Sequence, residues 1–129
     1  MGRLPACCTP SVAGNTTWRP AVPRGAPICA SIDDDPTAEQ SKQQVAPYLR
    51  GWEAVLGHQR VEVYANSKTI DWALHDGLGS YLWQHDWGPP KGYTHPAAHL
   101  RQVEIDARSV DGAGVDVDYV RKPRFGRWN

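Results

Sequence analysis

The sequence predicts an α/β fold in which the first strands pair in parallel, and three observations support this prediction. Short apolar runs typical of buried strands recur along the chain from residue 28 onward. A segment with apolar residues at helical spacing separates the first two runs, and a shorter helical segment separates the second run from the third. Strands that alternate with helices pair in parallel, because each helix carries the chain back along the sheet.

Composition limits the classes of function that remain. The chain has 129 residues, with 14 Lys and Arg balanced by 14 Asp and Glu, which is enough for a single domain. It contains no apolar run of the roughly 18 to 20 residues that cross a bilayer, so we expect no transmembrane segment. It also has no clustered basic face, and we therefore expect no nucleic-acid partner. Six Trp and five Tyr against one Phe suit a surface that stacks on sugars.

The first part of the chain differs from the rest. Residues 1–26 contain scattered Pro, Arg and Gly without apolar periodicity, and we expect a disordered arm there. The arm also lacks the apolar core of a signal peptide, so the sequence itself gives no export route. Cys7, Cys8 and Cys29 form neither a C-x-x-C motif nor an even set, so we expect no zinc site and no disulfide framework.

Residues 28–32 predict the first strand, and a helix follows it. Asp35 precedes Pro36 and is expected to cap this helix, because Asp favours the N-cap and Pro the first helical position. Gly57 is expected to end the helix, and Pro47 to kink or split it, because proline lacks a backbone donor. The apolar face of this helix consists of Val45, Leu49, Trp52 and Leu56.

The remaining elements follow from the same patterns. Asn66 and Ser67 are expected to cap a short helix that stops at Gly77, and a long Gly/Pro/aromatic loop, a common carrier of function, follows at residues 85–96. A Gly-rich turn at residues 111–114 separates the last two runs. The expected strands after the first are 61–65, 79–84, 100–105 and 115–120.

Several motifs in the second part of the chain resemble one known family when they are read in order. That family is the glycoside-hydrolase-like domain of unknown function common in actinobacteria, which is related to the glycosyl hydrolase family 25 lysozymes. The motifs are Pro27-Ile28-x-Ala30-Ser31-Ile32-Asp33-x-Asp35-Pro36, Val63-Tyr64, Tyr81-x-Trp83-Gln84, Ala98-His99-Leu100-Arg101-Gln102, Val115-Asp116-Val117-Asp118 and Phe125-Gly126-x-Trp128.

This resemblance implies a (β/α)8 TIM-type barrel, a secreted or cell-envelope protein, and peptidoglycan or another envelope glycan as the ligand. Barrels of this kind need at least about 200 residues. We therefore expect residues 27–129 to be the C-terminal half of the barrel domain, a partial barrel without the early strands. Cys29 and Glu62 stand where the family has an aromatic residue and a glycine, and Glu62 would place a charge inside the barrel.

Two aspartates follow the first predicted strand at a spacing of two residues. Asp33 and Asp35 would share one strand face about 7 Å apart, a separation within the range used by glycosidase carboxylate pairs. Repulsion between them should raise one pKa, so we expect Asp33 to be a stabilising carboxylate and Asp35 the general acid. The alternative is that Asp35 only caps the helix. The resemblance further places Asp116 at the barrel mouth near Asp33, whereas a solvated strand edge is the alternative for Asp116.

Aromatic and amide side chains near the predicted strand ends suit sugar binding. We expect the indole rings of Trp83 and Trp87 to stack on sugar rings and the Gln84 amide to bind a hydroxyl or N-acetyl group. Tyr64 and Gln102 would add to the same rim. The alternative is that Trp83 and Tyr64 are ordinary core aromatics.

Other chemistries find no support in the sequence. His95 and His99 have the i, i+4 spacing of metal-binding helices, but Pro96 lies between them and no Cys ligand or His-Glu-x-x-His motif accompanies them, so we expect no metal. Nucleophile elbows, Walker loops and dinucleotide fingerprints are also missing, and we expect no cofactor.

Three hypotheses follow for the function. The chain is a glycan hydrolase domain, a glycan-binding module without catalysis, or an inactive fragment. The second hypothesis draws on Asp35, which stands where family 25 lysozymes have Glu. A half-barrel would also leave strand edges unpaired, which favours self-association of two copies.

Overall fold

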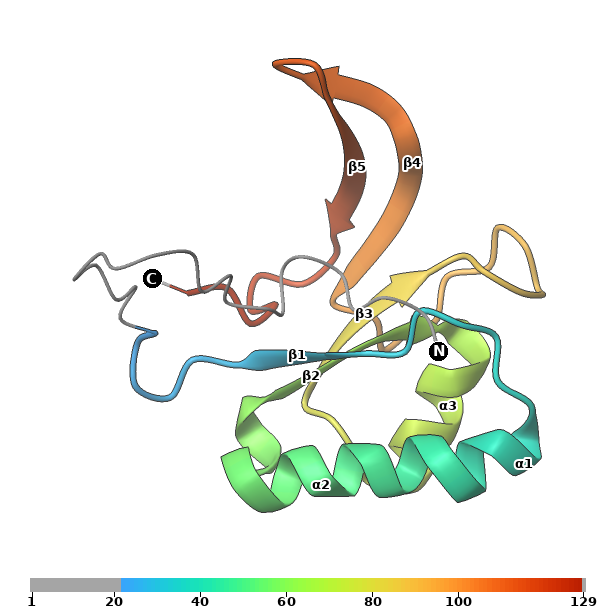
Figure 1. The fold of residues 1–129 in the computed structure, drawn as a ribbon, viewed down its shortest axis with the longest axis vertical. Helices are drawn as coiled ribbons and strands as arrows, with labels where there is room; N and C mark the ends of the chain where they lie inside the picture. The colour runs from blue at the N-terminus through green and yellow to red at the C-terminus, as the bar shows by residue number, and fades with distance from the viewer. Residues whose placement is uncertain (1–21, 129) are drawn as a thin grey trace, which may run out of the picture.

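The computed structural model describes residues 22–128, in which five strands form one sheet in the order β1-β2-β3-β4-β5. Figure 1 shows the helices on one side of β1, β2 and β3, while β4 and β5 project away as a long hairpin. The architecture is therefore an α/β half-barrel, as the sequence predicts. The elements in chain order are β1 (Ile28–Ser31), α1 (Ala38–Gln40), the π-helix η2 (Ser41–Val45), α2 (Ala46–Leu56), the 3₁₀ turn η3 (His58–Arg60), β2 (Val61–Asn66), α3 (Ser67–His75), β3 (Tyr81–His85), β4 (Leu100–Val110) and β5 (Ala113–Val120).

The predicted disordered arm falls almost entirely on residues 1–21, which lie outside the described residues. Within the described part of the chain, no helix has both the length and the apolar character needed to cross a bilayer.

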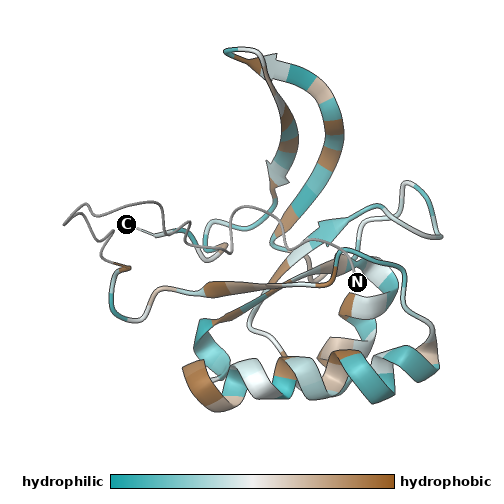
Figure 2. Cartoon of the chain, in the orientation of Figure 1, coloured by the Kyte–Doolittle hydropathy of each residue, from teal (hydrophilic) through white to brown (hydrophobic). Residues whose placement is uncertain are grey.

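The first four strands pair in parallel, but the last pair departs from the barrel pattern. β4 and β5 are antiparallel, and β4 continues to Val110, five residues beyond the predicted end. Only Asp111 and Gly112 connect the two strands, and both have positive φ, at 50° and 80°. A two-residue Asp-Gly turn with this geometry closes a hairpin and is too short for a parallel crossover. Figure 2 shows hydrophilic and hydrophobic residues alternating along the hairpin.

The predicted long helix is divided in the structure, and its cap differs from the prediction. Pro47, which lacks a backbone N–H, is the second residue of α2 and directly follows the π-helical segment, at whose end the Ala46 N–H bonds the Ser41 carbonyl five residues back. The N-cap is Thr37, which forms a capping box with Gln40, so the prediction that Asp35 caps this helix is wrong. Leu49 and Val45 pack into the core against the sheet, and Trp52 and Leu56 flank them.

The two faces of the sheet differ in character. Alternate strand residues such as Ala30, Val63 and Leu82 are buried under the helices. On the opposite face, Cys29 pairs in register with Glu62, and the next pair toward the strand ends joins Ser31 to Tyr64. This second face, here called the inner face, carries the polar and aromatic side chains that build the site.

Candidate functional site

A cleft of about 560 Å³ lies at the C-terminal ends of the parallel strands. Barrel enzymes place their catalytic and binding groups at this end. We call it the acidic cleft, because three of its residues are aspartates. Its walls are formed by Asp33, Tyr64, His85, Asp86, Trp87, Lys91, Gln102, Val103, Ile105 and Asp116.

Five predicted site residues meet in this cleft, and three of them form one hydrogen-bonded chain. The Tyr64 hydroxyl donates to Oε1 of Gln102 at 2.8 Å, and Nε2 of Gln102 donates to Oδ2 of Asp116 at 2.6 Å. Burial and the nearby charge of Asp33 raise the pKa of Tyr64, so its hydroxyl stays a donor. These two hydrogen bonds fix the side-chain amide of Gln102 in one orientation. Trp87 and Asp33 complete the set of five, and both are exposed to the cleft.

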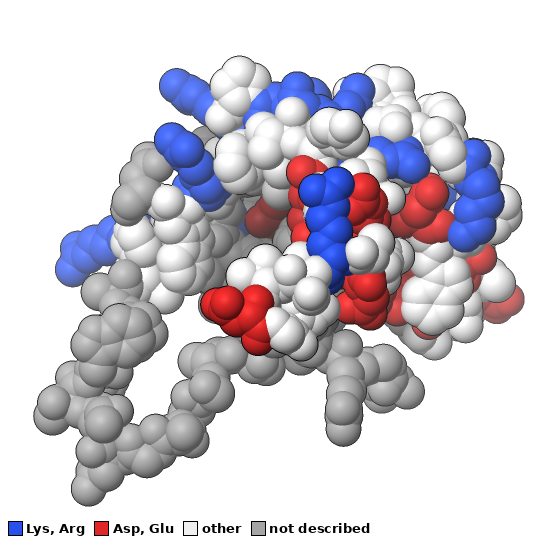
Figure 3. All heavy atoms as spheres, turned by 90° about the horizontal axis from the view of Figure 1, so that it is seen from above, with Lys and Arg blue, Asp and Glu red and all other residues white. Residues whose placement is uncertain are grey.

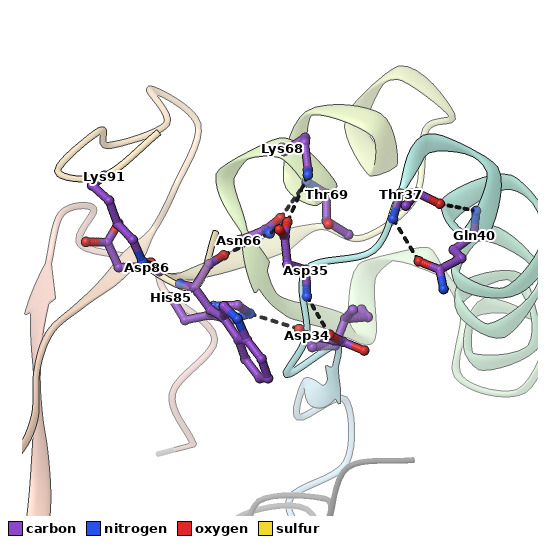
Figure 4. A network of polar contacts seen from close by, with 12 residues as sticks. Asp34, Asp35, Thr37, Gln40, Asn66, Lys68, Thr69, His85, Asp86 and Lys91 are labelled. Carbon is purple, nitrogen blue, oxygen red and sulfur yellow. Dashed lines mark hydrogen bonds and ion pairs between the residues drawn. The ribbon is translucent and has the colours of Figure 1, made fainter. Parts of the chain in front are cut away.

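Asp35 belongs to a different network beside the cleft. Its Oδ1 accepts from Nδ2 of Asn66 at 2.8 Å and lies 2.8 Å from Nζ of Lys68. The hydrogen bond and the charge of Lys68 hold the pKa of Asp35 below its ordinary value, so the predicted rise of this pKa is wrong. Figure 4 shows Asn66 and Lys68 converging on Asp35. Asp35 is thus held as a carboxylate at the junction of β1 and α3.

Glycine is required where the loop after β3 crosses this network. Gly88 has a φ of 90°, and a Cβ added there would lie 2.5 Å from Cγ of Asp35. The Trp87 carbonyl, one residue earlier, accepts from Nδ2 of Asn66 at 3.0 Å. The loop that carries Trp87 is therefore anchored directly to the Asp35 network.

Trp83 and Gln84 do not reach the cleft. The Trp83 indole packs edge-on against Tyr64 with 4.9 Å between ring centroids, and its Nε1 donates to Oδ1 of Asp118 at 2.8 Å. Burial raises the pKa of Asp118, which lies outside the cleft lining. Gln84 points to the helix side and is 1% exposed. This geometry favours the core alternative for Trp83, and Gln84 at this exposure presents almost no surface to a sugar.

Gln84 instead holds the functional loop. Its Nε2 donates to the Tyr93 carbonyl at 2.6 Å, and its Oε1 accepts from the His95 backbone N–H at 2.7 Å. The buried Arg101 guanidinium also donates to the Tyr93 carbonyl and lies 3.3 Å from Oδ1 of Asp86. Gln84 and Arg101 thus hold the loop that carries Trp87 and Lys91, through contacts near its start at Asp86 and near its end at Tyr93 and His95.

His85 is a cleft residue that the sequence analysis did not single out. Its Nε2 donates to the Ile32 carbonyl at 2.9 Å, and its Nδ1 accepts from the Trp87 N–H at 3.1 Å. These two contacts define the neutral ring with its proton on Nε2. Burial also lowers the pKa of His85. The signal was present in the sequence, since His85 lies two residues after Trp83 and therefore shares the inner face.

The charges of the cleft are uneven. Asp33, Asp86 and Asp116 contribute carboxylates, and among the described lining residues Lys91 is the one Lys or Arg. Nζ of Lys91 donates to the Asp86 carbonyl at 2.8 Å. Figure 3 shows acidic side chains gathered in the middle of the face seen from above. Such a cleft offers carboxylate acceptors to hydroxyl and amide groups beside the exposed ring of Trp87.

The histidines weighed as metal ligands serve backbone contacts instead. Nδ1 of His95 accepts from the Ala97 N–H at 3.1 Å, and Nδ1 of His99 accepts from the Leu82 N–H at 3.1 Å. Within residues 22–128, no group of three or more His, Cys, Asp and Glu side chains is arranged to hold a metal ion.

Comparison with known proteins agrees with this architecture. The chain is 71% identical over 106 residues to the Mycobacterium tuberculosis protein named "Putative peptidoglycan hydrolase Rv2525c", and the match covers 82% of this chain and 44% of that protein. A crystal structure of the M. tuberculosis Tat-secreted protein Rv2525c in complex with L-tartrate superposes with a TM-score of 0.81 at 70% identity, covering 83% of this chain and 52% of that one. A second crystal form, in complex with HEPES, gives a TM-score of 0.79 at 68% identity, with the same coverage of the two chains.

The chain thus spans about half the length of the relatives it matches. The family described as "Rv2525c-like, glycoside hydrolase-like domain" matches residues 12–120, which is most of the sequence. On this evidence from sequence and fold together, the chain belongs to the Rv2525c-like family of glycoside hydrolase-like domains.

Proposed function

We propose that the acidic cleft binds a cell-envelope glycan and that peptidoglycan is its first candidate. The observation that carries this proposal is the position of Trp87, whose side chain is 55% exposed at the edge of a cleft lined by carboxylates and amides. A sugar ring presents an apolar face to an indole and hydroxyl groups to polar acceptors. The printed name of the M. tuberculosis relative, which refers to peptidoglycan, supports the choice of glycan.

Binding is favoured over hydrolysis because of Asp35. A glycosidase needs one carboxyl group with a raised pKa to protonate the leaving group. Asp35, the residue that the sequence suggested for this role, has a lowered pKa and faces Lys68. Hydrolysis remains the second candidate, because Asp33 and Asp116 line one cleft at the catalytic end of the strands. In that case Asp33 and Asp116 would replace the predicted pair.

Sedimentation with purified, insoluble peptidoglycan tests the binding proposal. The unaltered chain should bind saturably, and Trp87→Ala should weaken binding about fivefold, since the stacking contact of one aromatic ring contributes on the order of 1 kcal/mol. Tyr119→Ala is the matched control, because Tyr119 is an exposed aromatic outside the cleft. Equal binding by the unaltered chain and Trp87→Ala would reject the site.

The same samples separate binding from hydrolysis. Release of reducing ends by the unaltered chain, abolished by both Asp33→Asn and Asp116→Asn, would establish the second candidate in place of a binding module. Saturable binding with no reducing ends, unchanged over long incubation, would establish the first.

We also propose that the chain acts in the cell envelope and self-associates. The relative is described as Tat-secreted, which supports an extracytoplasmic location. Among the described residues, β1 pairs on one side only, and Oε1 of Glu62 and Oγ of Ser31 are buried on the inner face without hydrogen-bond partners. An open edge and unsatisfied polar groups favour a second copy. Sedimentation velocity that gives a monomer at all concentrations would reject the association.

A further inference from the structure

The end of the sheet opposite the acidic cleft carries a second set of recesses. One cleft of about 560 Å³ includes Arg60, His99 and Arg124, and an adjoining one of about 360 Å³ includes Phe125 and Arg127. Arg124 and Tyr81 line both clefts. Tyr81 begins β3 and His85 ends it, so the two ends of the sheet lie about 13 Å apart along this strand.

The lining residues of the larger cleft share a position in the fold. Arg60 directly precedes β2, and His99 directly precedes β4, while Arg124 follows the end of β5, which runs antiparallel to β4. The topology therefore brings basic side chains from three separate segments to one end of the sheet. We call this end the basic end.

Acidic residues line the cleft at one end of the sheet, and basic residues line the clefts at the other end. Three aspartates line the acidic cleft, whereas none of the described residues that line the two basic clefts is Asp or Glu. In Figure 3 the left margin shows Lys and Arg side chains without acidic neighbours. Arg124 and Arg127 make neither an ion pair nor a hydrogen bond with any residue in the described part of the chain. An Arg cluster without carboxylates to neutralise it attracts an anion.

The donors at the basic end are also oriented for a ligand. Nδ1 of His99 accepts from the Leu82 N–H, which places the ring proton on Nε2 as a remaining donor. Burial and the charge of Lys122 lower the pKa of His99, consistent with a neutral ring. Nε of Arg60 donates to the Ala26 carbonyl at 3.1 Å, and this contact holds its guanidinium against the chain. No residue within 22–128 accepts a hydrogen bond from the terminal N–H groups of Arg60, so these groups remain for a ligand.

The smaller cleft supplies apolar walls beside these donors. It is lined by the rings of Pro27, Tyr81 and Phe125. A Cβ added to Gly126 would lie 3.3 Å from Cγ of Tyr81, so glycine lets the C-terminal segment approach this ring closely. Nε1 of Trp128 donates to the Pro27 carbonyl at 2.9 Å and holds that segment in place.

We propose that the basic end is a binding site for a phosphorylated sugar, with the phosphate among Arg60, His99 and Arg124 and the sugar ring against Tyr81 and Phe125. A phosphate is favoured over a carboxylate because the cleft is lined by donors from three separate segments, Arg60, His99 and Arg124. A tetrahedral phosphate presents three acceptor oxygens, whereas a carboxylate presents two in one plane. This site is separate from the acidic cleft and does not depend on the function proposed there.

Titration calorimetry of the 129-residue chain with glucose 1-phosphate, at about 50 mM salt, tests the proposal. The expected dissociation constant is about 1 mM or tighter. Arg124→Gln and Arg60→Gln should each weaken binding about tenfold, which corresponds to about 1.4 kcal/mol. Arg124 is exposed, so its substitution leaves the fold intact, and circular dichroism checks this. Arg50→Gln, at an exposed position of α2, is the matched control and should bind as the unaltered chain does.

Further ligands distinguish the parts of the proposal. Glucose should give no binding, and inorganic phosphate should bind more weakly than glucose 1-phosphate. Glucuronate binding more tightly than glucose 1-phosphate would overturn the assignment to phosphate. The whole proposal fails if glucose 1-phosphate gives no saturable heat, or if Arg50→Gln weakens binding as much as Arg124→Gln. Trp87→Ala should leave this binding unchanged, so the result is independent of the acidic cleft.

Discussion

Nζ of Lys68 lies 2.8 Å from Oδ1 of Asp35, and this ion pair joins the loop after β1 to the first turn of α3. The same carboxylate accepts from Asn66, which also caps α3 through a contact of its Oδ1 with the Thr69 N–H. Asp35 is therefore a structural anion that sets the entrance to the acidic cleft. Its negative charge, rather than a transferable proton, is what the fold uses.

Lys68→Met should lower the free energy of unfolding by about 0.5 to 1 kcal/mol at neutral pH, because the pair is partly exposed. The folded-state pKa of Asp35 lies below its unfolded value, so this stabilisation is present above about pH 4 and is lost as the pH falls through the folded pKa. Urea unfolding at pH 7 and near pH 2 measures both values. Lys42→Met, at an exposed position of η2, is the control. An equal effect of Lys68→Met at both pH values would contradict the pairing.

Glu62 is a second carboxyl group with a perturbed environment. It is 8% exposed on the inner face, and burial raises its pKa to about 7. Because the folded pKa lies above the unfolded one, stability is greatest below about pH 4.5 and falls until the pH passes about 7. Glu62→Gln removes this penalty and should stabilise the chain by up to about 3 kcal/mol at pH 8, but little at pH 5.

Urea unfolding of Glu62→Gln across pH 5 to 8 measures the difference. Glu39→Gln changes an exposed acid of α1 and should show no such trend. If self-association covers the inner face, the benefit of Glu62→Gln should depend on protein concentration. A difference between Glu62→Gln and the unaltered chain that stays constant with pH would contradict the raised pKa.

His85 should remain the Nε2–H tautomer over the neutral range. Its two ring nitrogens bond the Ile32 carbonyl and the Trp87 N–H, and burial lowers its pKa. Stability from the neutral ring is therefore present above about pH 6.5 and is lost as the pH falls toward the folded pKa. Long-range proton–nitrogen NMR reports the tautomer, with the exposed His75 as a reference. Two protonated ring nitrogens on His85 at pH 7 would contradict this assignment.

Much of the fold follows from local patterns that the sequence carries. The apolar runs before Asp33 and before Asn66 are buried strands, and Asn66 caps α3 as predicted. The Gly-rich turn that contains Asp111 and Gly112 was predicted, but the antiparallel pairing of β4 and β5 was not, because the barrel of the family consists of parallel strands. Local signals define elements, whereas the (β/α)8 barrel that the resemblance implies is built from parallel strands and contains no such hairpin.

The site was harder to predict, because some polar side chains form hydrogen bonds within the protein and are therefore not available to a ligand. Asp33, Tyr64, Trp87, Gln102 and Asp116 line the cleft as their spacing suggests. Asp35 and Gln84 were chosen for their chemistry, but their polar atoms are bonded within the fold. The partner of Asp35, Lys68, lies on another element far along the sequence, and the partner of Gln84, the Tyr93 carbonyl, belongs to an irregular loop. No periodicity in the sequence reports such contacts.

Gln84 should act on the cleft through the loop that it holds. Its amide bonds the Tyr93 carbonyl and the His95 N–H, and the side chain is almost fully buried. Gln84→Leu keeps the volume but leaves the His95 N–H without its acceptor, which should cost about 1 to 3 kcal/mol. The Tyr93 carbonyl keeps its contact with Arg101, so the damage should centre on His95.

Hydrogen exchange measured by mass spectrometry tests this role. In Gln84→Leu, peptides that cover residues 86–98 should exchange faster, while peptides from α2 should change little, because local opening follows the lost contacts. Gln44→Leu, at an exposed position of η2, is the matched control and should match the unaltered chain in both regions. Faster exchange throughout Gln84→Leu would indicate global destabilisation, whereas an unchanged loop would show that Arg101 alone holds it. Loosening confined to the loop, together with weaker glycan binding, would establish that Gln84 positions Trp87 without touching the sugar.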